Sequence, residues 1–493
     1  MRLESKPWWA RGFRPAAQID RRRFRPALVP LEGRQLLSTF TVTNTSGDAT
    51  TRGSLPWAIH QANYSSPGFD VINFNLRGPG PHIIQVKDTL FLNEQIAIQG
   101  TSQPGYNGSP LVVVKGDGSV PSIFLLQGES SGSTIQGLAI SGFGANAVTI
   151  MDGSQGNWIQ NNYLGFYHDA SGATHLNMSE TSRHAAGVGI QSSFNVVRYN
   201  TISGVYNGVN IGEDIGGKWS GKVYKTNAIQ YNQIGTDPTG ATASGYGNDS
   251  DGIFLGAGAS ENFLGPDNVI SGNKSSGVEL LHSTNWGNVV FANLIGMNRA
   301  GTAAIPNGEL GILFANGATG NAIGGPFGGN LIAGNLLGGI SLGTAAFGGA
   351  SGNWVQNNVI GLNAAQTAPL GSQGVGINIE SGSASNSITG NVVAGNLVNG
   401  FQLSNATGNY MASNFIGRAY GGAWIANGGF GVALLAGASN NWVVSNEFGS
   451  NTVGNIYVDA AARGNALQDV PGILGPGAGG GGGIPGRPGR PRR

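Results

Sequence analysis

The chain of 493 residues contains no cysteine, no long apolar run and few charged residues. Without cysteine, the chain has no disulfide scaffold, no thiolate metal site and no cysteine nucleophile. No run of about 18 apolar residues is present, so the sequence predicts no membrane-spanning helix. The N-terminal segment also lacks the apolar stretch of about 7–15 residues that a secretory signal needs.

Charged residues make up only 10% of the chain, whereas glycine occurs 86 times. This composition favours one elongated repeat domain over several ordinary globular domains. The charge is uneven: residues 1–37 hold nine Lys or Arg against three acids, residues 472–493 hold four Arg and no acid, and residues 38–471 hold 13 basic and 22 acidic side chains. A central body of that sign repels phosphate backbones, so we expect no nucleic-acid partner.

A short apolar triplet returns eleven times between Val148 and Val458, with long and short gaps in alternation. Each triplet reads as a strand with one buried face, because its first and third residues point the same way. Such a period indicates a solenoid, and the short gaps fit one turn of a parallel β-helix. We predict an all-β fold, a right-handed parallel β-helix over residues 76–471. The triplets are Val148–Ile150, Val188–Ile190, Val209–Ile211, Ile253–Leu255, Val278–Leu280, Ile312–Phe314, Ile340–Leu342, Ile377–Ile379, Phe401–Leu403, Val432–Leu434 and Ile456–Val458.

Pairs of asparagines five positions apart recur between the triplets. We expect them at turns between strands, because Asn tolerates the left-handed conformation and bonds its own backbone there. On coils stacked about 4.8 Å apart, their amides can also hydrogen-bond one another as a ladder. The eight pairs are Asn157/Asn162, Asn195/Asn200, Asn227/Asn232, Asn288/Asn293, Asn353/Asn358, Asn386/Asn391, Asn409/Asn414 and Asn441/Asn446.

The remaining segments define the ends of the domain and its loops. Residues 1–38 are basic and irregular, which predicts a disordered leader, and residues 472–493 form a Gly/Pro/Arg-rich tail that cannot bury a core. Residues 39–75 combine a strand with a short helix capped by Ser54, and we expect them to close the N-terminal end of the β-helix.

Every second coil is lengthened by a loop after an aliphatic-Gly pair. These pairs are Leu164-Gly165, Ile234-Gly235, Ile295-Gly296, Ile360-Gly361 and Ile416-Gly417.

Four segments resemble known sequences. IQYNQIGTDPTGATASGYGN at 229–248 and NVISGNKSSGVEL at 268–280 resemble right-handed parallel β-helix repeats of bacterial surface and secreted proteins, a group of the pectate-lyase fold type. The segment at 41–74 is similar to one that precedes such repeats in adhesin-like exported proteins. LEGRQLLS at 31–38 resembles a short leader of bacterial extracellular proteins. The resemblance implies an extracellular or cell-surface location. It carries no activity across.

An enzyme of this fold would show paired Asp on adjacent coils, or an acid cluster for calcium with a basic side chain that abstracts a proton. The outward middle positions of the triplets hold one carboxylate, Glu279. The sequence therefore predicts no catalytic stack of acids. The enzyme alternative is a polysaccharide lyase or hydrolase whose site lies near the loops at 165–186 and 235–251.

The loop at 165–186 is the richest polar segment. Imidazoles and carboxylates together can bind a divalent metal or transfer protons, although solvated charges also collect in ordinary loops and the spacings match no metal motif. Acids of the next long loop could add oxygen ligands for Ca²⁺. The candidate cluster comprises His168, Asp169, His175, Glu180, Arg183, His184, Asp237, Asp249 and Asp251.

Four aromatic residues occupy one place in the repeat, directly after the first Asn, and the alternation points them outward. They are Trp158, Trp354, Tyr410 and Trp442. A column of exposed rings could stack on sugar faces, unless the long loops fold over it. The preferred hypothesis is a non-catalytic, exported β-helix protein that presents a repetitive surface for adhesion or cell-envelope structure and binds glycans or other envelope components through that column.

Overall fold

The computed structural model describes residues 38–65, 68–177, 185–213, 219–468 and 473–474. The leader predicted at 1–38 lies outside these ranges except for its last residue, and the predicted tail at 472–493 lies outside them except for Ile473 and Leu474. The description therefore concerns the unit that begins at Leu37, and the leader and tail boundaries remain proposals.

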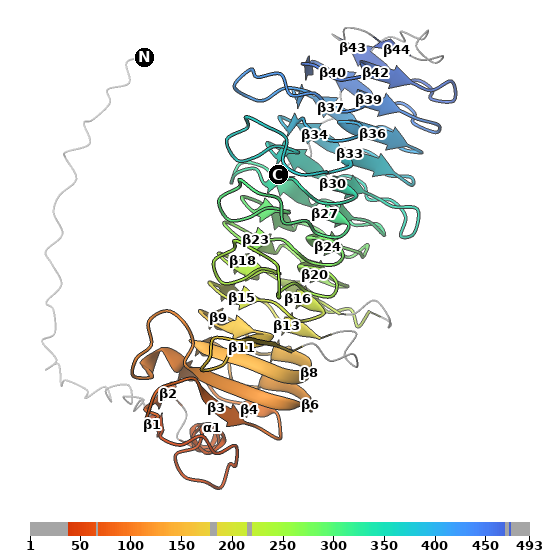
Figure 1. Ribbon diagram of the computed structural model, residues 1–493. Coiled ribbons are helices and arrows are strands. Elements are labelled where there is room, and N and C mark those ends of the chain that lie inside the picture. Colours follow the sequence, from red (N-terminus) through yellow and green to blue (C-terminus); the bar gives the residue numbers. More distant parts are fainter. Residues whose placement is uncertain (1–37, 66–67, 178–184, 214–218, 469–472, 475–493) are drawn as a thin grey trace, which may run out of the picture. The chain divides into compact units, whose positions relative to one another are not determined.

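This unit is a parallel β-helix, as the sequence predicts. Its strands pair in parallel from coil to coil, and Figure 1 shows them stacked from α1 (Leu55–Tyr64) to β43 and β44. Each coil contributes strands to three faces, which we call the first, second and third face in chain order.

The first face is one parallel sheet of 15 strands. It consists of β1 (Thr39–Val42), β2 (Asp70–Phe74), β5 (Ile96–Gln99), β7 (Thr134–Gln136), β9 (Trp158–Gln160), β14 (Val196–Arg198), β18 (Ala228–Gln230), β22 (Phe263–Leu264), β25 (Val289–Val290), β28 (Ala322–Gly324), β31 (Trp354–Gln356), β34 (Ser387–Thr389), β37 (Tyr410–Ala412), β40 (Trp442–Val444) and β43 (Ala466–Gln468).

The second face carries the aliphatic-Gly pairs, and two long strands extend from it onto the third face: β6 (Val112–Leu126) and β8 (Leu138–Ile150). Its other strands are β3 (His82–Gln85), β10 (Tyr163–Leu164), β15 (Thr201–Ile202), β19 (Gln233–Ile234), β23 (Val269–Ile270), β26 (Leu294–Ile295), β29 (Leu331–Ile332), β32 (Val359–Ile360), β35 (Val392–Val393), β38 (Phe415–Ile416) and β41 (Glu447–Phe448).

The third face contains the eleven triplets. The registers align them without a slip, for example Val209 with Ile253 and Ile253 with Val278. Besides β6 and β8, its strands are β4 (Leu90–Leu92), β13 (Ala186–Ile190), β16 (Asn207–Ile211), β20 (Ile253–Leu255), β24 (Val278–Leu280), β27 (Leu310–Phe314), β30 (Gly338–Leu342), β33 (Val375–Glu380), β36 (Phe401–Ser404), β39 (Phe430–Leu434), β42 (Gly454–Val458) and β44 (Ile473–Leu474).

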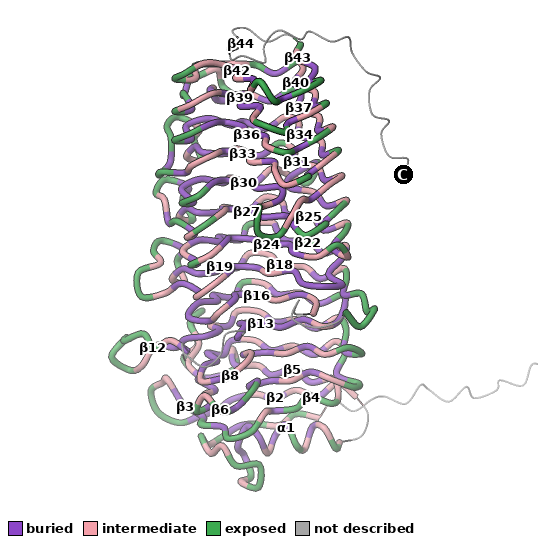
Figure 2. Tube along the Cα trace, turned by 90° about the vertical axis from the view of Figure 1, so that its right-hand side faces the viewer, coloured by how far each residue is buried: buried purple, intermediate pink, exposed green. Residues whose placement is uncertain are grey.

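The interior is one continuous apolar core. Ile159, Val355 and Val443 of the first face are fully buried, whereas the residues on either side of each are partly exposed. Burial of one alternate set of side chains is what stabilises each thin coil against its neighbours. In Figure 2 the buried residues follow the coils, and exposed residues gather on the projecting loops.

Asparagine ladders run along the corners, as expected. Asn157 Nδ2 donates to Asn195 Oδ1 at 2.9 Å, and Asn195 Nδ2 donates to Asn227 Oδ1 at 3.0 Å on the next coil. The expectation that these Asn adopt the left-handed conformation is wrong: the residue before the second Asn does so, such as Tyr199 with φ +55. Because that residue makes the turn, the Asn keeps an ordinary backbone and directs its amide inward, where it bonds the coils above and below.

The N-terminal helix α1 covers the first coils. Ser54 Oγ accepts a hydrogen bond from Trp57 N at 3.1 Å, which satisfies one of the free amides of the first turn. Leu55, Ala58 and Ile59 are buried in the main core. The described residues contain no helix that is long and apolar enough to cross a membrane.

The five long loops leave at one corner, as predicted. Their glycines follow β10, β19, β26, β32 and β38 and all have φ between +76 and +91. The loops fold back over the second face: Met297 and Leu370, for example, pack with Ala333 outside the main core. The described parts of these loops therefore lie over the second face, whereas the aromatic column lies on the first face.

Candidate functional site

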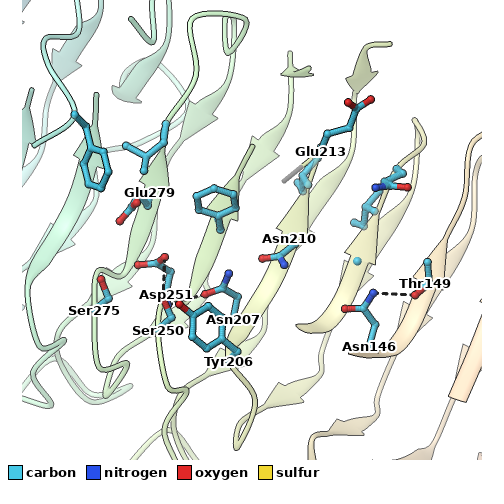
Figure 3. Close-up of a pocket in the computed structure, with 18 of the residues that line it drawn as sticks. Asn146, Thr149, Tyr206, Asn207, Asn210, Glu213, Ser250, Asp251, Ser275 and Glu279 are labelled. Atoms are coloured by element: carbon cyan, nitrogen blue, oxygen red, sulfur yellow. Dashed lines mark hydrogen bonds between the residues drawn. The ribbon is translucent and has the colours of Figure 1, made fainter. Parts of the chain in front are cut away.

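A groove of about 480 Å³ crosses the third face over β13, β16, β20 and β24 (Figure 3). Side chains before, within and after these strands line it. They are Asn146, Thr149, Ile190, Gln191, Tyr206, Asn207, Asn210, Ile211, Glu213, Ser250, Asp251, Phe254, Ser275, Glu279, Leu281, Glu309 and Phe347, together with Gly189 and Gly212.

The coil register places two of the acids, Asp251 and Glu279, on neighbouring coils. Phe254 pairs with Glu279, so both occupy outward middle positions of adjacent triplets. Asp251 lies two residues before Ile253, at the corner, where its amide donates to Asn207 Oδ1 at 2.9 Å. Asp251 Oδ1 in turn accepts from Ser276 N at 3.0 Å. Asp251 is thus an acid at a position where the preceding coil has an amide, and its second oxygen, Oδ2, accepts from Ser250 Oγ at 3.4 Å.

Asp251 and Glu279 form a buried acid pair. Their exposed fractions are only 5% and 7%, and their side chains are hydrogen-bonded to each other. Burial raises the pKa of Glu279 to about 9, and the charges of Asp251 and Glu309 add to the effect. Burial also raises the pKa of Asp251, to about 6. At neutral pH the pair therefore holds one proton, on Glu279, which donates to the Asp251 carboxylate.

The pair can exchange a proton with a ligand or hydrogen-bond a hydroxyl, but its spacing limits the chemistry. Two carboxyl groups that divide the work of glycoside hydrolysis stand roughly 5–9.5 Å apart, which leaves room for the sugar carbon or a water. A hydrogen-bonded pair is closer than that. Two acids of the lining remain that could act as a separate second carboxylate: Glu213, and the exposed Glu309, whose Oε2 accepts from Ser275 Oγ at 3.2 Å.

The rest of the groove is polar and aromatic but not basic. Phe254 and Tyr206 are partly exposed, and Phe347 is 45% exposed. Asn210 Oδ1 has no hydrogen-bond partner among the described residues, although it is shielded from solvent. None of the described side chains that line the groove belongs to Lys, Arg or His.

The described part of the predicted polar loop, residues 165–177 and 185–186, does not contribute to this groove. Its first part is a hairpin of β11 (Phe166–His168) and β12 (Thr174–Leu176), in which His175 Nε2 lies 2.8 Å from Asp169 Oδ2. His168 Nδ1 lies 3.1 Å from Thr174 Oγ1. The hairpin packs on the second face through Tyr167. Glu180, Arg183 and His184 lie outside the described residues.

The three acids proposed for Ca²⁺ do not converge either. Asp237 is held within its own loop, where it accepts from Ala241 N at 2.8 Å and Thr242 N at 2.9 Å. Asp249 pairs with Lys274 at 2.5 Å. Among the described residues, no three His, Asp or Glu side chains are grouped so that they could hold a metal ion. Of the six predicted polar residues that the structure describes, only Asp251 lines the groove.

The four predicted aromatic residues do share one column of the first face, but they do not form a continuous surface. Tyr410 pairs with Trp442, whereas Ser387 separates Trp354 from Tyr410. Trp158 is six coils from Trp354, which is about 29 Å at about 4.8 Å per coil. All four rings are half-buried, and the Arg198 guanidinium lies 4.3 Å from the Trp158 ring centre.

The acid pair is not among the sequence predictions, which place Glu279 at an isolated outward triplet position and Asp251 in a loop. The signal that connects them is the triplet register: with Ile253 aligned to Val278, Asp251 and Glu279 fall on neighbouring coils. The triplet pattern does not indicate that Asp251, which lies at a corner outside the triplet, is buried.

A second cavity, of about 680 Å³, lies at the N-terminal end between α1 and residues 85–93. The side chain of Asn63, which lines it, is bonded to the backbone of residues 91 and 93. Asn63 Nδ2 donates to the Phe91 carbonyl at 2.7 Å, and Asn63 Oδ1 accepts from Asn93 N at 2.9 Å. It is larger than the groove but contains no buried acid pair, so the groove is the stronger candidate.

These features define the class of the protein as a parallel β-helix with an acidic groove on one face. Residues 303–468, less than half of the chain, match the family model described as periplasmic copper-binding protein (NosD). No curated protein sequence matches the chain.

Solved structures with a similar fold include the Dettilon tailspike protein, with 15% identity, a TM-score of 0.45 and coverage of 85% of this chain and 68% of that chain. The A-module of the Azotobacter vinelandii mannuronan C-5 epimerase has 14% identity, a TM-score of 0.41 and coverage of 88% and 100%. A DFA-IIIase from Arthrobacter chlorophenolicus A6 has 14% identity, a TM-score of 0.40 and coverage of 88% and 94%. At such values the likenesses say nothing about what this chain binds.

The region that matches the copper-binding family does not fit copper. Imidazole, thiolate and thioether are the side chains that favour this metal. Residues 303–468 contain no histidine and no cysteine. Their one methionine, Met411, is 1% exposed and packs in the main core. No copper-dependent step is therefore assigned to this chain.

Proposed function

We propose that this chain is an exported, non-catalytic β-helix protein that binds an uncharged saccharide in the groove of the third face, in a role in adhesion or cell-envelope structure. The observation that carries the proposal is the buried pair of Asp251 and Glu279 next to Phe254, in a groove without basic side chains.

The groove chemistry suits sugar hydroxyls. Glu279 offers a donor, and Asp251 and Asn210 offer acceptors held by the coil register. Phe254 and Tyr206 offer apolar faces for the C–H side of a sugar ring. The acids repel a polyuronate, so the charge favours uncharged saccharides over acidic ones.

Export rests on other observations. LEGRQLLS at 31–38 resembles a leader of bacterial extracellular proteins. The family model that matches residues 303–468 is described as periplasmic. Both support a location outside the cytoplasm, and fractionation of cells tests it. Recovery of the protein with the cytoplasmic fraction contradicts this part of the proposal.

Binding is tested with the full chain on a panel of neutral oligosaccharides, with polyuronates as the acidic comparison. We expect Phe254→Ala and Glu279→Gln each to weaken binding about tenfold, since each removes one interaction of roughly 1.4 kcal/mol. The matched controls are Tyr457→Ala and Glu380→Gln, which change the same residue classes on the third face outside the groove. Binding that prefers polyuronates, or that the control variants weaken equally, contradicts the proposal.

One observation favours a second candidate, a polysaccharide hydrolase. Glu279 is protonated at neutral pH and could act as a general acid, with Glu309 as the second carboxylate. A lyase is less well supported, because no basic side chain lines the described groove. Release of reducing ends from a neutral glycan, abolished in Glu279→Gln, would favour the hydrolase. The pair His184→Ala and Asp251→Ala separates a contribution of the polar loop from that of the groove.

A further inference from the structure

A ridge of exposed apolar side chains runs along the corner before the third face. Leu337 is 62% exposed, Val398 is 44% exposed and Val453 is 55% exposed. Backbone hydrogen bonds place them in one column on every second coil, with glycines between: Val453 N donates to the Gly429 carbonyl at 3.1 Å, and Val398 N donates to the Gly374 carbonyl at 3.0 Å. The column continues to the rim of the groove, where Leu337 N donates to the Glu309 carbonyl at 2.8 Å and Glu309 N donates to the Ser275 carbonyl at 3.0 Å. The ridge therefore leads from the C-terminal coils to the acidic groove.

The last described strand lies on the same face as this ridge, and its end, Leu474, pairs with Tyr457, four residues or about 13 Å across the face from Val453. β44 pairs with β42 on the third face, through Ile473 and Ile456. Counted in coils from β44, Leu337 is five coils away, Glu309 six and Glu279 seven. At about 4.8 Å per coil these separations are about 24, 29 and 34 Å.

The remaining chain has the composition and length to cover this path. Residues 475–493 contain four Arg, four Pro and no acid, and their one large apolar residue, Ile484, precedes the first arginine, Arg487. At about 3.1 Å per residue in an extended polyproline-type chain, Ile484 can reach about 31 Å from Leu474 and Arg487 about 40 Å. The order of apolar residue and then arginines matches the order of ridge and then acids.

We propose that the C-terminal tail, residues 475–493, docks back along this corner, with Ile484 on the apolar ridge and its arginines at the acidic groove. The tail supplies the positive charge that the groove lining lacks. Because it is tethered on the same face, its local concentration exceeds that of a free ligand of equal affinity. A docked tail would compete with a saccharide for the groove. This competition rests on the proposed function of the groove, whereas the docking itself does not rest on it.

Docking is tested by disulfide trapping in the full chain, which has no natural cysteine. One variant combines Ser275→Cys with Arg490→Cys, and its matched control combines Ser283→Cys with Arg490→Cys. Ser275 lines the groove at the corner, whereas Ser283 is an exposed serine of the same coil that follows β24 at the other edge of the third face. We expect the first pair to cross-link about tenfold faster, which is the gain of a docked over a merely tethered tail.

Further measurements test whether the tail is held by charge and whether it belongs to the same chain. An increase in ionic strength from about 0.1 to about 1 M shortens the Debye length from about 10 to about 3 Å and is expected to remove most of the advantage of the Ser275 site. Glu309→Gln is expected to reduce it. Equal rates at Ser275 and Ser283 overturn the proposal. Cross-links formed between a labelled and an unlabelled copy overturn it as well, because the occupant is then the tail of a second chain.

The effect on saccharide binding is measured separately. Replacement of Arg487, Arg490, Arg492 and Arg493 by Ser is expected to raise the affinity for a neutral oligosaccharide several-fold. Replacement of Arg21, Arg22, Arg23 and Arg25 by Ser is the matched control in the leader. If the leader variant alone raises the affinity, the leader and not the tail covers the groove, and the proposal is wrong. If cross-linking succeeds but no saccharide binds, the docking stands and the proposed function fails.

Discussion

Glu279 of β24 is hydrogen-bonded to Asp251 of the preceding coil, and both side chains are more than nine-tenths buried. A buried acid is more easily kept protonated than ionised, because the apolar surroundings disfavour the charge. The native state therefore binds a proton at Glu279 in a pH range where the unfolded chain has already released it. Stability must then depend on pH in a direction that follows from this shift.

The first prediction concerns that dependence. The pKa of Glu279 rises from 4.5 to about 9 on folding, so its contribution is fully present below the unfolded value and is lost as pH increases through the folded value. We expect the midpoint of urea unfolding to fall as pH rises from about 5 to about 9, and Glu279→Gln to flatten this slope and to stabilise the chain at the upper end by at least about 1 kcal/mol. Glu380→Gln, outside the groove, serves as the control. If the urea midpoint changes with pH equally in the native chain and in Glu279→Gln, Glu279 is ionised in the folded state.

The second prediction concerns the ladders. Asn293 Oδ1 accepts from Asn268 Nδ2 at 2.9 Å, and Asn293 Nδ2 donates to the Leu264 carbonyl at 2.8 Å and to Asn330 Oδ1 at 3.0 Å. Asn293→Ala leaves buried partners on two coils unsatisfied, and we expect it to cost about 3 kcal/mol in unfolding free energy. The exposed Asn107 is the control, with a change within about 0.5 kcal/mol on substitution by Ala. A similar, small loss at both positions would mean that water replaces the ladder.

The sequence could predict the fold because its two periodic signals act on every coil. The triplets determine which side chains enter the core, and the Asn pairs mark the corners, so each repeat confirms the others. A third ladder, from Asn248 and Asn273 to Asn427 and Asn451, escaped notice. Its residues follow the second face, where loops of unequal length hide the spacing, and Gln373 replaces Asn on one coil.

The site was harder to predict because it breaks the repeat. Asp251 and Glu279 are 28 positions apart, and only their place on neighbouring coils makes them a pair. The number of polar residues within one short segment favours the loop that contains His168 and His175. In the structure that density belongs to a solvated hairpin, while the two acids that matter are scattered among apolar neighbours.

The third prediction separates backbone strain from coil contact. Gly296 has φ +82, and a Cβ added there would lie 2.3 Å from the Ala333 carbonyl oxygen of the next coil. Gly221 has a similar φ of +88, but a Cβ there meets nothing within 4 Å. We expect Gly221→Ala to cost about 1 kcal/mol through its backbone conformation alone, and Gly296→Ala to cost more, about 3 kcal/mol, because it also forces the coils apart. Chemical unfolding of both variants measures the difference, and equal losses would show that the corner can relax.

The fourth prediction concerns the aromatic column of the first face. Trp158 is remote from the other rings and covered by Arg198, and only Tyr410 and Trp442 are direct neighbours. A sugar chain that stacked on the column would therefore find two adjacent platforms at most. If the groove of the third face is the binding site, Trp158→Ala and Trp442→Ala should leave the affinity for a neutral oligosaccharide within about twofold, while Phe254→Ala weakens it by about tenfold. Titration calorimetry on the three variants decides between the faces. Loss of binding in Trp442→Ala with an unaffected Phe254→Ala would place the saccharide on the first face, because only a ring that contacts the ligand contributes its stacking energy.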